Sequence, residues 1–257
     1  MAGYIGSKAV LLSTTAATVT GDMTVDTSTL KVDSTNNKVG IGTASPSHPL
    51  HIVTSTDGTG VSGDDTWAAI IQNAEATDGR SYGLKIMAGS TTDQAFAITD
   101  HDGSNDLMAV DGYGHVTKPK QPAFLVHASG QSNIALSTQV ALTMGTEIFD
   151  NNADYSSNTF TAPVTGRYQF SWHVRFDNLD SAATYYRVYM AASNRTFWTV
   201  YRATHGFVSD TDYWSFNGAH LVDMDANDTC QLGVLQADGT QQTDIDNETH
   251  FCGFLVC

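Results

Sequence analysis

The stretch that decides the fold is GRYQFSWHVRF, residues 166–176. Large apolar side chains occupy every second position from Tyr168 to Phe176, and polar side chains stand between them. This alternation is typical of a β-strand with one buried face, because successive side chains in a strand point to opposite sides of the sheet. It predicts that Trp172 lies in a core and that His173 points the opposite way.

Shorter runs of the same kind recur along residues 122–257, and no long amphipathic helical pattern lies between them. Recurring short strands rich in aromatic residues are typical of an all-β sandwich or jelly roll. Besides the stretch above, the expected strands are Tyr186–Met190, Phe197–Tyr201, Trp214–Leu221, Cys230–Leu235 and His250–Val256.

The composition favours strands and turns over helices. Only 15% of the 257 residues are charged, and Thr, Ser, Asn and Gly are abundant. The net charge of −15 repels nucleic-acid phosphates and anionic lipid surfaces. We therefore expect no nucleic-acid partner and no membrane insertion. Solubility accounts for the acidity, and divalent-cation binding is the alternative.

Residues 23–53 contain short alternating runs, each with only one or two apolar residues per face. A single chain cannot bury a core with so little apolar surface, whereas three chains wrapped around one axis can. The pattern therefore predicts a thin oligomeric stalk. Its runs are Met23–Asp26, Leu30–Asp33, Val39–Thr43 and Leu50–Val53.

Residues 54–117 are a glycine-punctuated β region, and a proline-containing linker, residues 118–121, follows it. Proline interrupts the hydrogen-bond ladder of a sheet, and every lysine of the chain lies at or before Lys120. Both features predict a domain boundary here. The strands expected in this region are Trp67–Gln72, Tyr82–Ala88, Ala95–Thr99 and Leu107–Val110.

Two stretches resemble known viral proteins. Lys38–Pro46, followed by Leu50–Ile52, is similar to the shaft motif of bacteriophage tail-fibre proteins. Met1–Ser7 resembles the start of tail-fibre proteins from marine podovirus-type phages. The resemblance implies a virion protein assembled in the host cytoplasm, with Tyr4 and Ile5 attaching it to another tail or capsid protein.

The C-terminal region resembles the globular head of the first complement component, a family related in fold to tumour necrosis factor. Blocks in matching order carry the resemblance, among them Pro122–Val126, Phe160–Val164, Asp228–Leu235 and Phe251–Leu255, whereas residues 133–145 fit loosely. It implies a ten-stranded jelly roll that assembles as a homotrimer, with two further copies of itself. The expected core and trimer residues are Phe124, Phe149, Tyr155, Phe160, Gly166, Tyr168, Phe170, Phe251, Gly253 and Phe254.

Together these observations predict an all-β protein with an extended trimeric stalk, a small β domain and a jelly-roll head. The proposed divisions are an attachment segment 1–22, a shaft 23–53, a small β domain or widened shaft 54–117, the linker 118–121 and the head 122–257.

The sequence shows none of the usual catalytic motifs: no nucleophile elbow, no phosphate loop and no zinc-spaced His and Cys set. We therefore expect a protein that is not an enzyme and carries no cofactor. Ordinary β-turns explain the three acidic stretches Asp100–Asp106, Asp177–Asp180 and Asp223–Asp228. Calcium binding by these turns is the alternative, because the complement-type family that the head resembles often binds calcium. Cys230, Cys252 and Cys257 are odd in number, so at least one is free or pairs between chains, and we expect small buried side chains in a reducing compartment.

Three functions are compatible with these features. The leading hypothesis is a trimeric tail fibre whose head binds a host-surface glycan or protein. Its receptor contacts would be Trp198, Tyr201, Phe207 and Tyr213, although core packing is the alternative role of each. A purely structural fibre or a capsid or tail decoration protein is the second hypothesis. A polysaccharide-degrading tailspike is the third, but the long β-helix repeats of such spikes are missing.

Overall fold

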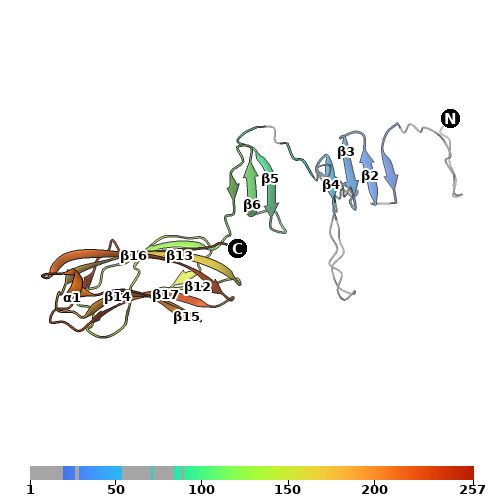
Figure 1. Ribbon diagram of the computed structural model, residues 1–257. Coiled ribbons are helices and arrows are strands. Elements are labelled where there is room, and N and C mark those ends of the chain that lie inside the picture. The colour runs from blue at the N-terminus through green and yellow to red at the C-terminus, as the bar shows by residue number, and fades with distance from the viewer. Residues whose placement is uncertain (1–19, 27–28, 54–70, 72–83, 88–89) are drawn as a thin grey trace, which may run out of the picture. The chain divides into compact units, whose positions relative to one another are not determined.

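The computed structural model describes residues 20–26, 29–53, 71, 84–87 and 90–257 (Figure 1). The chain forms two compact units, Met1–Lys85 and Ile86–Cys257, which we describe separately. The predicted attachment residues Tyr4 and Ile5, and nearly all of the predicted strand 67–72, lie outside the described residues.

The first unit contains a four-stranded sheet in the order β1-β2-β3-β4. Its first two ladders are antiparallel, and β3 pairs with β4 in parallel. Each alternating run expected in residues 23–53 is a strand. The strands are β1 (Met23–Val25), β2 (Leu30–Asp33), β3 (Lys38–Ile41) and β4 (Leu50–Ile52).

A close turn follows β3. Gly42 has a φ of +74°, and a Cβ atom there would lie only 2.0 Å from the carbonyl oxygen of Val53. Any side chain at this position would therefore push β3 away from the end of β4. The small sheet nonetheless leaves apolar side chains in solvent, with exposed fractions of 48% for Val25 and 62% for Leu50.

The second unit begins with a three-stranded antiparallel sheet, β5-β6-β7. The strands expected at 95–99 and 107–110 are confirmed. The strand expected at 82–88 is wrong where it can be seen, because residues 84–87 pair with no other described residue. Alternation alone does not make a strand without a partner for its hydrogen bonds. The strands are β5 (Gln94–Thr99), β6 (Asp106–Asp111) and β7 (Val116–Thr117).

The head is a sandwich of two antiparallel sheets (Figure 1). The first has the path β10-β8-β19-β13-β16, and short β18 pairs with β13. Its strands are β8 (Ala123–His127), β10 (Thr146–Asp150), β13 (Gly166–Leu179), β16 (Thr211–Met224), β18 (Asp244–Ile245) and β19 (His250–Leu255).

The second sheet has the path β11-β12-β17-β14-β15, and short β9 pairs with β17. The two paths together contain ten strands, so the predicted ten-stranded jelly roll is confirmed. The strands are β9 (Val140–Ala141), β11 (Tyr155–Ser156), β12 (Thr159–Thr161), β14 (Tyr185–Ala192), β15 (Arg195–Tyr201) and β17 (Thr229–Ala237).

One short helix, α1 (Ala203–Gly206), follows β15. It is a single turn, in agreement with the lack of a long amphipathic pattern in the sequence. In the described part of the chain, no helix has the length and apolar character needed to cross a membrane.

The head core is built around β13, whose inward side chains are the apolar residues of the alternating stretch. Tyr168, Phe170 and Phe176 are completely buried, and Trp172 is 3% exposed. The ring of Phe170 packs directly over Gly253 of β19, where a Cβ atom would lie 2.5 Å from it. Glycine at this position therefore admits the aromatic ring between the sheets.

Rings from four other strands complete this core. The Phe124 ring stacks on Tyr155 and Phe160, with centroids 4.8 and 5.1 Å away. It also meets Phe251 edge-on, and Phe251 in turn stacks on Phe170. These contacts join both sheets through one aromatic cluster, so the core depends on all of its members.

We expect Phe170→Ala to lower the free energy of unfolding of the full chain by about 3–5 kcal/mol, because it removes a fully buried ring from a close-packed cluster. Urea denaturation followed by tryptophan fluorescence measures this loss. The matched control is Ser171→Ala, one residue along and on the outer side of the sheet, which should change it by less than about 1 kcal/mol. Equal effects would contradict the assignment of faces.

Candidate binding surfaces of the head

The outer side of the β13 sheet is the first candidate surface, which we call the histidine face. It consists of the alternate residues Gln169 to Asp177 of β13 and the residues paired with them on β8, β10, β16 and β19. At one end Gln169 lies between two apolar side chains, Leu221 and Phe254, which are 55% and 49% exposed. This end of the face is therefore apolar and open to solvent.

The next row of the histidine face begins at the edge strand β10. Phe149 of β10 pairs with Leu125 of β8 and is 45% exposed. Leu125 is paired with Cys252, and the row continues through Ser171 and Ala219. The row between Leu125 and the outer strand β16 consists of the small side chains Cys252, Ser171 and Ala219.

The predicted core and trimer residues thus differ in exposure. Phe149 and Phe254 are exposed on the histidine face, and Gly166 is half-buried at the start of β13. The remaining members are buried between the sheets, namely Phe124, Tyr155, Phe160, Tyr168, Phe170, Phe251 and Gly253.

Three histidines form a cross-strand row in the middle of the histidine face. The ring centroid of His250 lies 5.5 Å from that of His127 and 5.2 Å from that of His173. Both pairs are stacked, and the Nδ1 atom of His173 lies 2.6 Å from Oδ1 of Asn217. The row joins β8, β19, β13 and β16.

The surroundings of His250 disfavour its charged form. Partial burial lowers the pKa of His250 below its ordinary value of 6.5, and the neighbouring His173 and His127 lower it further. The backbone carbonyl of Glu248, which accepts a hydrogen bond from the ring at 3.2 Å, opposes this shift. Protonation would therefore place a cation in a stack that favours neutral imidazole.

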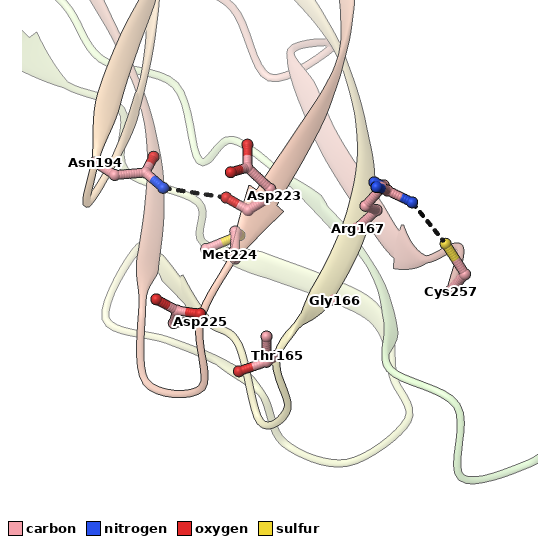
Figure 2. A pocket seen from close by; sticks show the side chains of 8 residues that line it. All are labelled: Thr165, Gly166, Arg167, Asn194, Asp223, Met224, Asp225 and Cys257. Atoms are coloured by element: carbon pink, nitrogen blue, oxygen red, sulfur yellow. Dashed lines mark hydrogen bonds between the residues drawn. The ribbon is translucent and has the colours of Figure 1, made fainter.

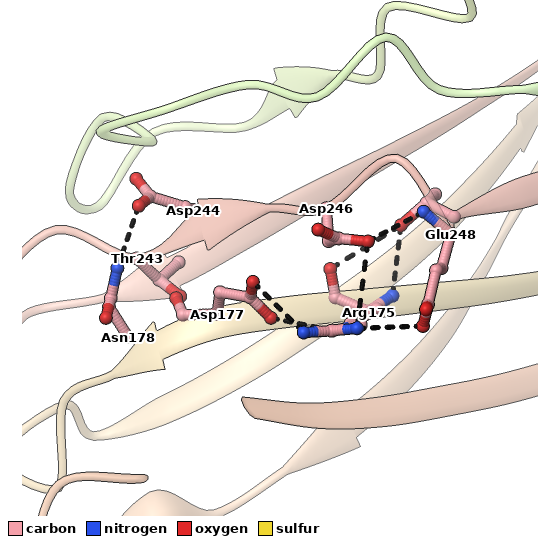
Figure 3. Close-up of polar contacts among 8 residues, drawn as sticks. Arg175, Asp177, Asn178, Thr243, Asp244, Asp246 and Glu248 are labelled. Carbon is pink, nitrogen blue, oxygen red and sulfur yellow. Dashed lines mark hydrogen bonds and ion pairs between the residues drawn. The ribbon is translucent and has the colours of Figure 1, made fainter. Parts of the chain in front are cut away.

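Beyond the histidines, the face is charged, and Figure 3 shows its central cation. Arg175 lies 2.8 Å from the carboxylate of Asp177, 2.9 Å from that of Glu248 and 3.9 Å from that of Asp246. The carboxylate of Glu248, followed by that of Asp177, raises the pKa of Arg175. The guanidinium also lies 4.9 Å from the ring centroid of Tyr213, which is 63% exposed.

A buried aspartate fixes the turn that follows β13. The Asp180 side chain is only 1% exposed, and its carboxylate accepts hydrogen bonds from the backbone amides of Ala182, Thr240 and Gln241. Burial alone would raise the pKa of Asp180, but these backbone donors outweigh it and hold the pKa below the ordinary value. The hydroxyl of Tyr186 accepts a hydrogen bond from the Asp180 amide at 2.6 Å.

The predicted receptor residues do not form one patch. Tyr201 points between the sheets, where it packs against Phe207 and Phe216 at centroid distances of 5.1 and 5.5 Å. Trp198 projects from the outer side of the second sheet and is 41% exposed. Tyr213 lies on the histidine face. Packing between the sheets therefore accounts for Tyr201 and Phe207.

A hollow of about 340 Å³ lies near the start of β13 (Figure 2). The Asp223 carboxylate on its wall is neutralised by Arg195 at 2.8 Å. Arg167 donates a weak hydrogen bond to the Cys257 sulfur at 3.9 Å. These contacts are typical of a solvated rim, and no general base lies within hydrogen-bond distance of the thiol in the described contacts. The lining residues are Thr165, Gly166, Arg167, Asn194, Asp223, Met224, Asp225 and Cys257.

The acidic turns use their carboxylates within the chain. Asp100 accepts hydrogen bonds from the backbone of Ser104 and from the side chain of Asn105, and the Asn105 side chain is the main reason that its pKa falls to about 2. Asp228 caps the backbone amide of Asp225 at 3.0 Å. Within the described residues, no group of His, Cys, Asp or Glu side chains is arranged to hold a metal ion. Calcium binding stays a prediction.

The three cysteines are free thiols in different environments. Cys230 is buried, and burial raises its pKa to about 12. Cys252 is half-buried on the histidine face, and Cys257 is exposed. Cys230 therefore behaves as a small core side chain, whereas Cys257 is accessible to solvent.

No known protein family and no curated protein matches the sequence. Solved structures with a similar arrangement include the globular domain of a zebrafish complement 1qA protein, with 19% sequence identity and a TM-score of 0.39. Murine APRIL is another, with 14% identity and a TM-score of 0.38. Each alignment covers 53% of this chain, and 98% and 100% of the respective solved chain.

The strand order defines the class of the head on its own terms, an antiparallel jelly-roll sandwich with one partly apolar outer face. The histidine row is the feature of this face that sequence reasoning missed. His127, His173 and His250 are far apart in the chain, and only the register of three strands brings them together.

We expect the free energy of unfolding to fall as the pH is lowered from 7.5 to 5.5. Because the folded state lowers the pKa of His250, the unfolded chain takes up its proton first, near pH 6.5, and is favoured below that pH. His250→Gln should reduce this pH dependence, as measured by urea denaturation at several pH values. His101→Gln, in the β5–β6 turn, is the control. If His250→Gln left the pH dependence of the free energy of unfolding unchanged, His250 would not be its source.

Proposed function

We propose that this chain is a non-enzymatic tail-fibre protein of a virus, assembled in the host cytoplasm, which works as a homotrimer. Its head trimerises through the histidine face and binds a glycan or protein on the host surface. The observation that carries the proposal is the apolar end of this face, where Phe149, Leu221 and Phe254 stand in solvent in a single chain.

The exposed apolar side chains support self-association because they lie at the same end of one face of the sheet. Isolated surface hydrophobes are common, but a contiguous apolar patch surrounded by polar residues is typical of a protein interface. Three copies arranged around one axis would each cover a neighbour's patch and leave none open.

The N-terminal sheet supports the same oligomeric state independently. Its exposed Val25, Ile41 and Leu50 leave it without a core of its own. A second and a third copy would provide the missing apolar contacts. The virion role is supported by the tail-fibre-like motif, whose Gly42 is needed for the turn after β3. Residues Tyr4 and Ile5 would attach the fibre to another virion protein.

Sedimentation of the purified full chain tests the assembly. We expect a species of three times 27.5 kDa. Phe254→Asp should dissociate it, because an unpaired carboxylate in a buried interface costs several kcal/mol. Val208→Asp, in a loop where Val208 is fully exposed, is the matched control and should remain trimeric. A monodisperse wild-type monomer, or a Phe254→Asp trimer as stable as the wild type, would contradict the proposal.

Adsorption to host cells tests the receptor role separately. The purified trimer should bind these cells and compete with infecting virions, because three linked heads convert weak single contacts into tight attachment. A trimer that neither adsorbs nor competes would indicate the purely structural fibre. Release of reducing sugars from host polysaccharide would instead indicate the tailspike.

A further inference from the structure

The outer side of the second sheet carries a compact cluster of aromatic rings around one arginine. We call it the arginine platform, and it consists of Tyr185, Arg187, Tyr189 and Trp198. Tyr185, Arg187 and Tyr189 alternate along β14 and therefore share one face. Trp198 of β15 is paired with Tyr189, and their ring centroids are 5.4 Å apart.

The guanidinium of Arg187 is held between two rings. Its central carbon lies 4.4 Å from the ring centroid of Trp198 and 4.9 Å from that of Tyr185. Such contacts offset part of the cost of removing a cation from water. They also restrain the planar group, so that little conformational freedom is lost when it binds a ligand.

Arg187 has no counter-ion within the described part of the chain, although the protein carries a net charge of −15. Arg175 and Arg195, by contrast, are each ion-paired with an aspartate. The Nε atom of Arg187 is buried and makes no hydrogen bond among the described residues. A partly desolvated cation with unused donors is a site that an anion would complete.

The remainder of the platform is suited to a ring-shaped ligand. Trp198 is 41% exposed, and the neighbouring Val200, which pairs with Arg187, is 50% exposed. Tyr189 is buried and packs directly over Gly233, where a Cβ atom would clash with the tyrosine ring. Tyr189 also contacts the Trp198 ring. The planar fork of Arg187 matches a carboxylate, which can accept two hydrogen bonds from it. The exposed parts of Trp198 and Val200 offer apolar contact to the C–H groups of a sugar ring that bears the carboxylate.

We infer that the arginine platform binds a carboxylated sugar, such as a sialic or uronic acid residue of a surface glycan. The Arg187 guanidinium would pair with the carboxylate, and the exposed part of Trp198 would contact the C–H groups of the ring. This inference rests on the proposed receptor function and names its ligand class. The platform lies on the sheet opposite the histidine face, so trimerisation through that face would leave all three copies accessible.

Titration calorimetry of the full chain with sialyllactose and trigalacturonate, against lactose and galactotriose, tests the inference. At least one acidic sugar should bind about tenfold or more tightly than its neutral counterpart, as expected for a charge-assisted hydrogen-bonded pair. Arg187→Gln and Trp198→Ala should each weaken that binding about tenfold. Arg195→Gln makes the same change of charge at the start of β15, the strand that carries Trp198, and should bind like the wild type.

Arg187→Lys keeps the charge but loses the fork, and should recover only part of the affinity. If circular dichroism shows that Arg187→Gln does not fold, Arg187→Lys and Trp198→Ala test the binding of the acidic sugar in its place. Failure of both acidic sugars to bind, equal binding of neutral and acidic sugars, or an unchanged affinity in Arg187→Gln would overturn the inference. Binding of a hexaglutamate peptide instead of the sugars, with the same dependence on Arg187, would assign the platform to an acidic peptide.

Sedimentation and cell adsorption of the same samples separate this inference from the proposed function. A trimer that adsorbs to host cells without binding either acidic sugar would overturn the ligand class and leave the fibre assignment standing. A monomer that binds an acidic sugar through Arg187 would overturn the proposed trimer, and the ligand class of the arginine platform would stand.

Discussion

The register of β13 is the constraint on which the head depends. Side chains alternate strictly along a strand, so the placement that buries Tyr168, Phe170 and Phe176 also decides what the outer face presents. A shift by one residue would bury His173 and Arg175 and expose the aromatic core. Core packing and the composition of the histidine face are therefore consequences of a single choice of register.

Much of the head was predictable because this choice is visible in the sequence. Alternation located β13, β14, β15 and β16, and aromatic content indicated two packed sheets. The side chains that meet across strands were not predictable, because pairing depends on contacts between distant segments. The row formed by His127, His250 and His173 and the pairing of Tyr189 with Trp198 both arise in this way.

Exposure of aromatic residues was the harder inference for the same reason. Tyr201 and Trp198 lie three residues apart on β15 and therefore point to opposite faces, with Tyr201 on the inner face beside Tyr186 and Trp198 on the outer face beside Tyr189. Sequence alone identifies both as aromatic strand residues. The inverse error occurred at residues 84–87, where an apolar pattern without a partner strand forms no ladder.

The two outer faces of the head differ in a way that suits two separate tasks. The histidine face changes from apolar at Phe254 to charged at Arg175, and such an order favours one alignment between copies over others. On the other sheet, the buried Asp180 holds the turn that leads into β14. Tyr186 bonds to the same turn, which restrains the start of the strand carrying Tyr185 and Arg187. The arginine platform is thus positioned by a rigid turn, which lowers the cost of ordering it when a ligand binds.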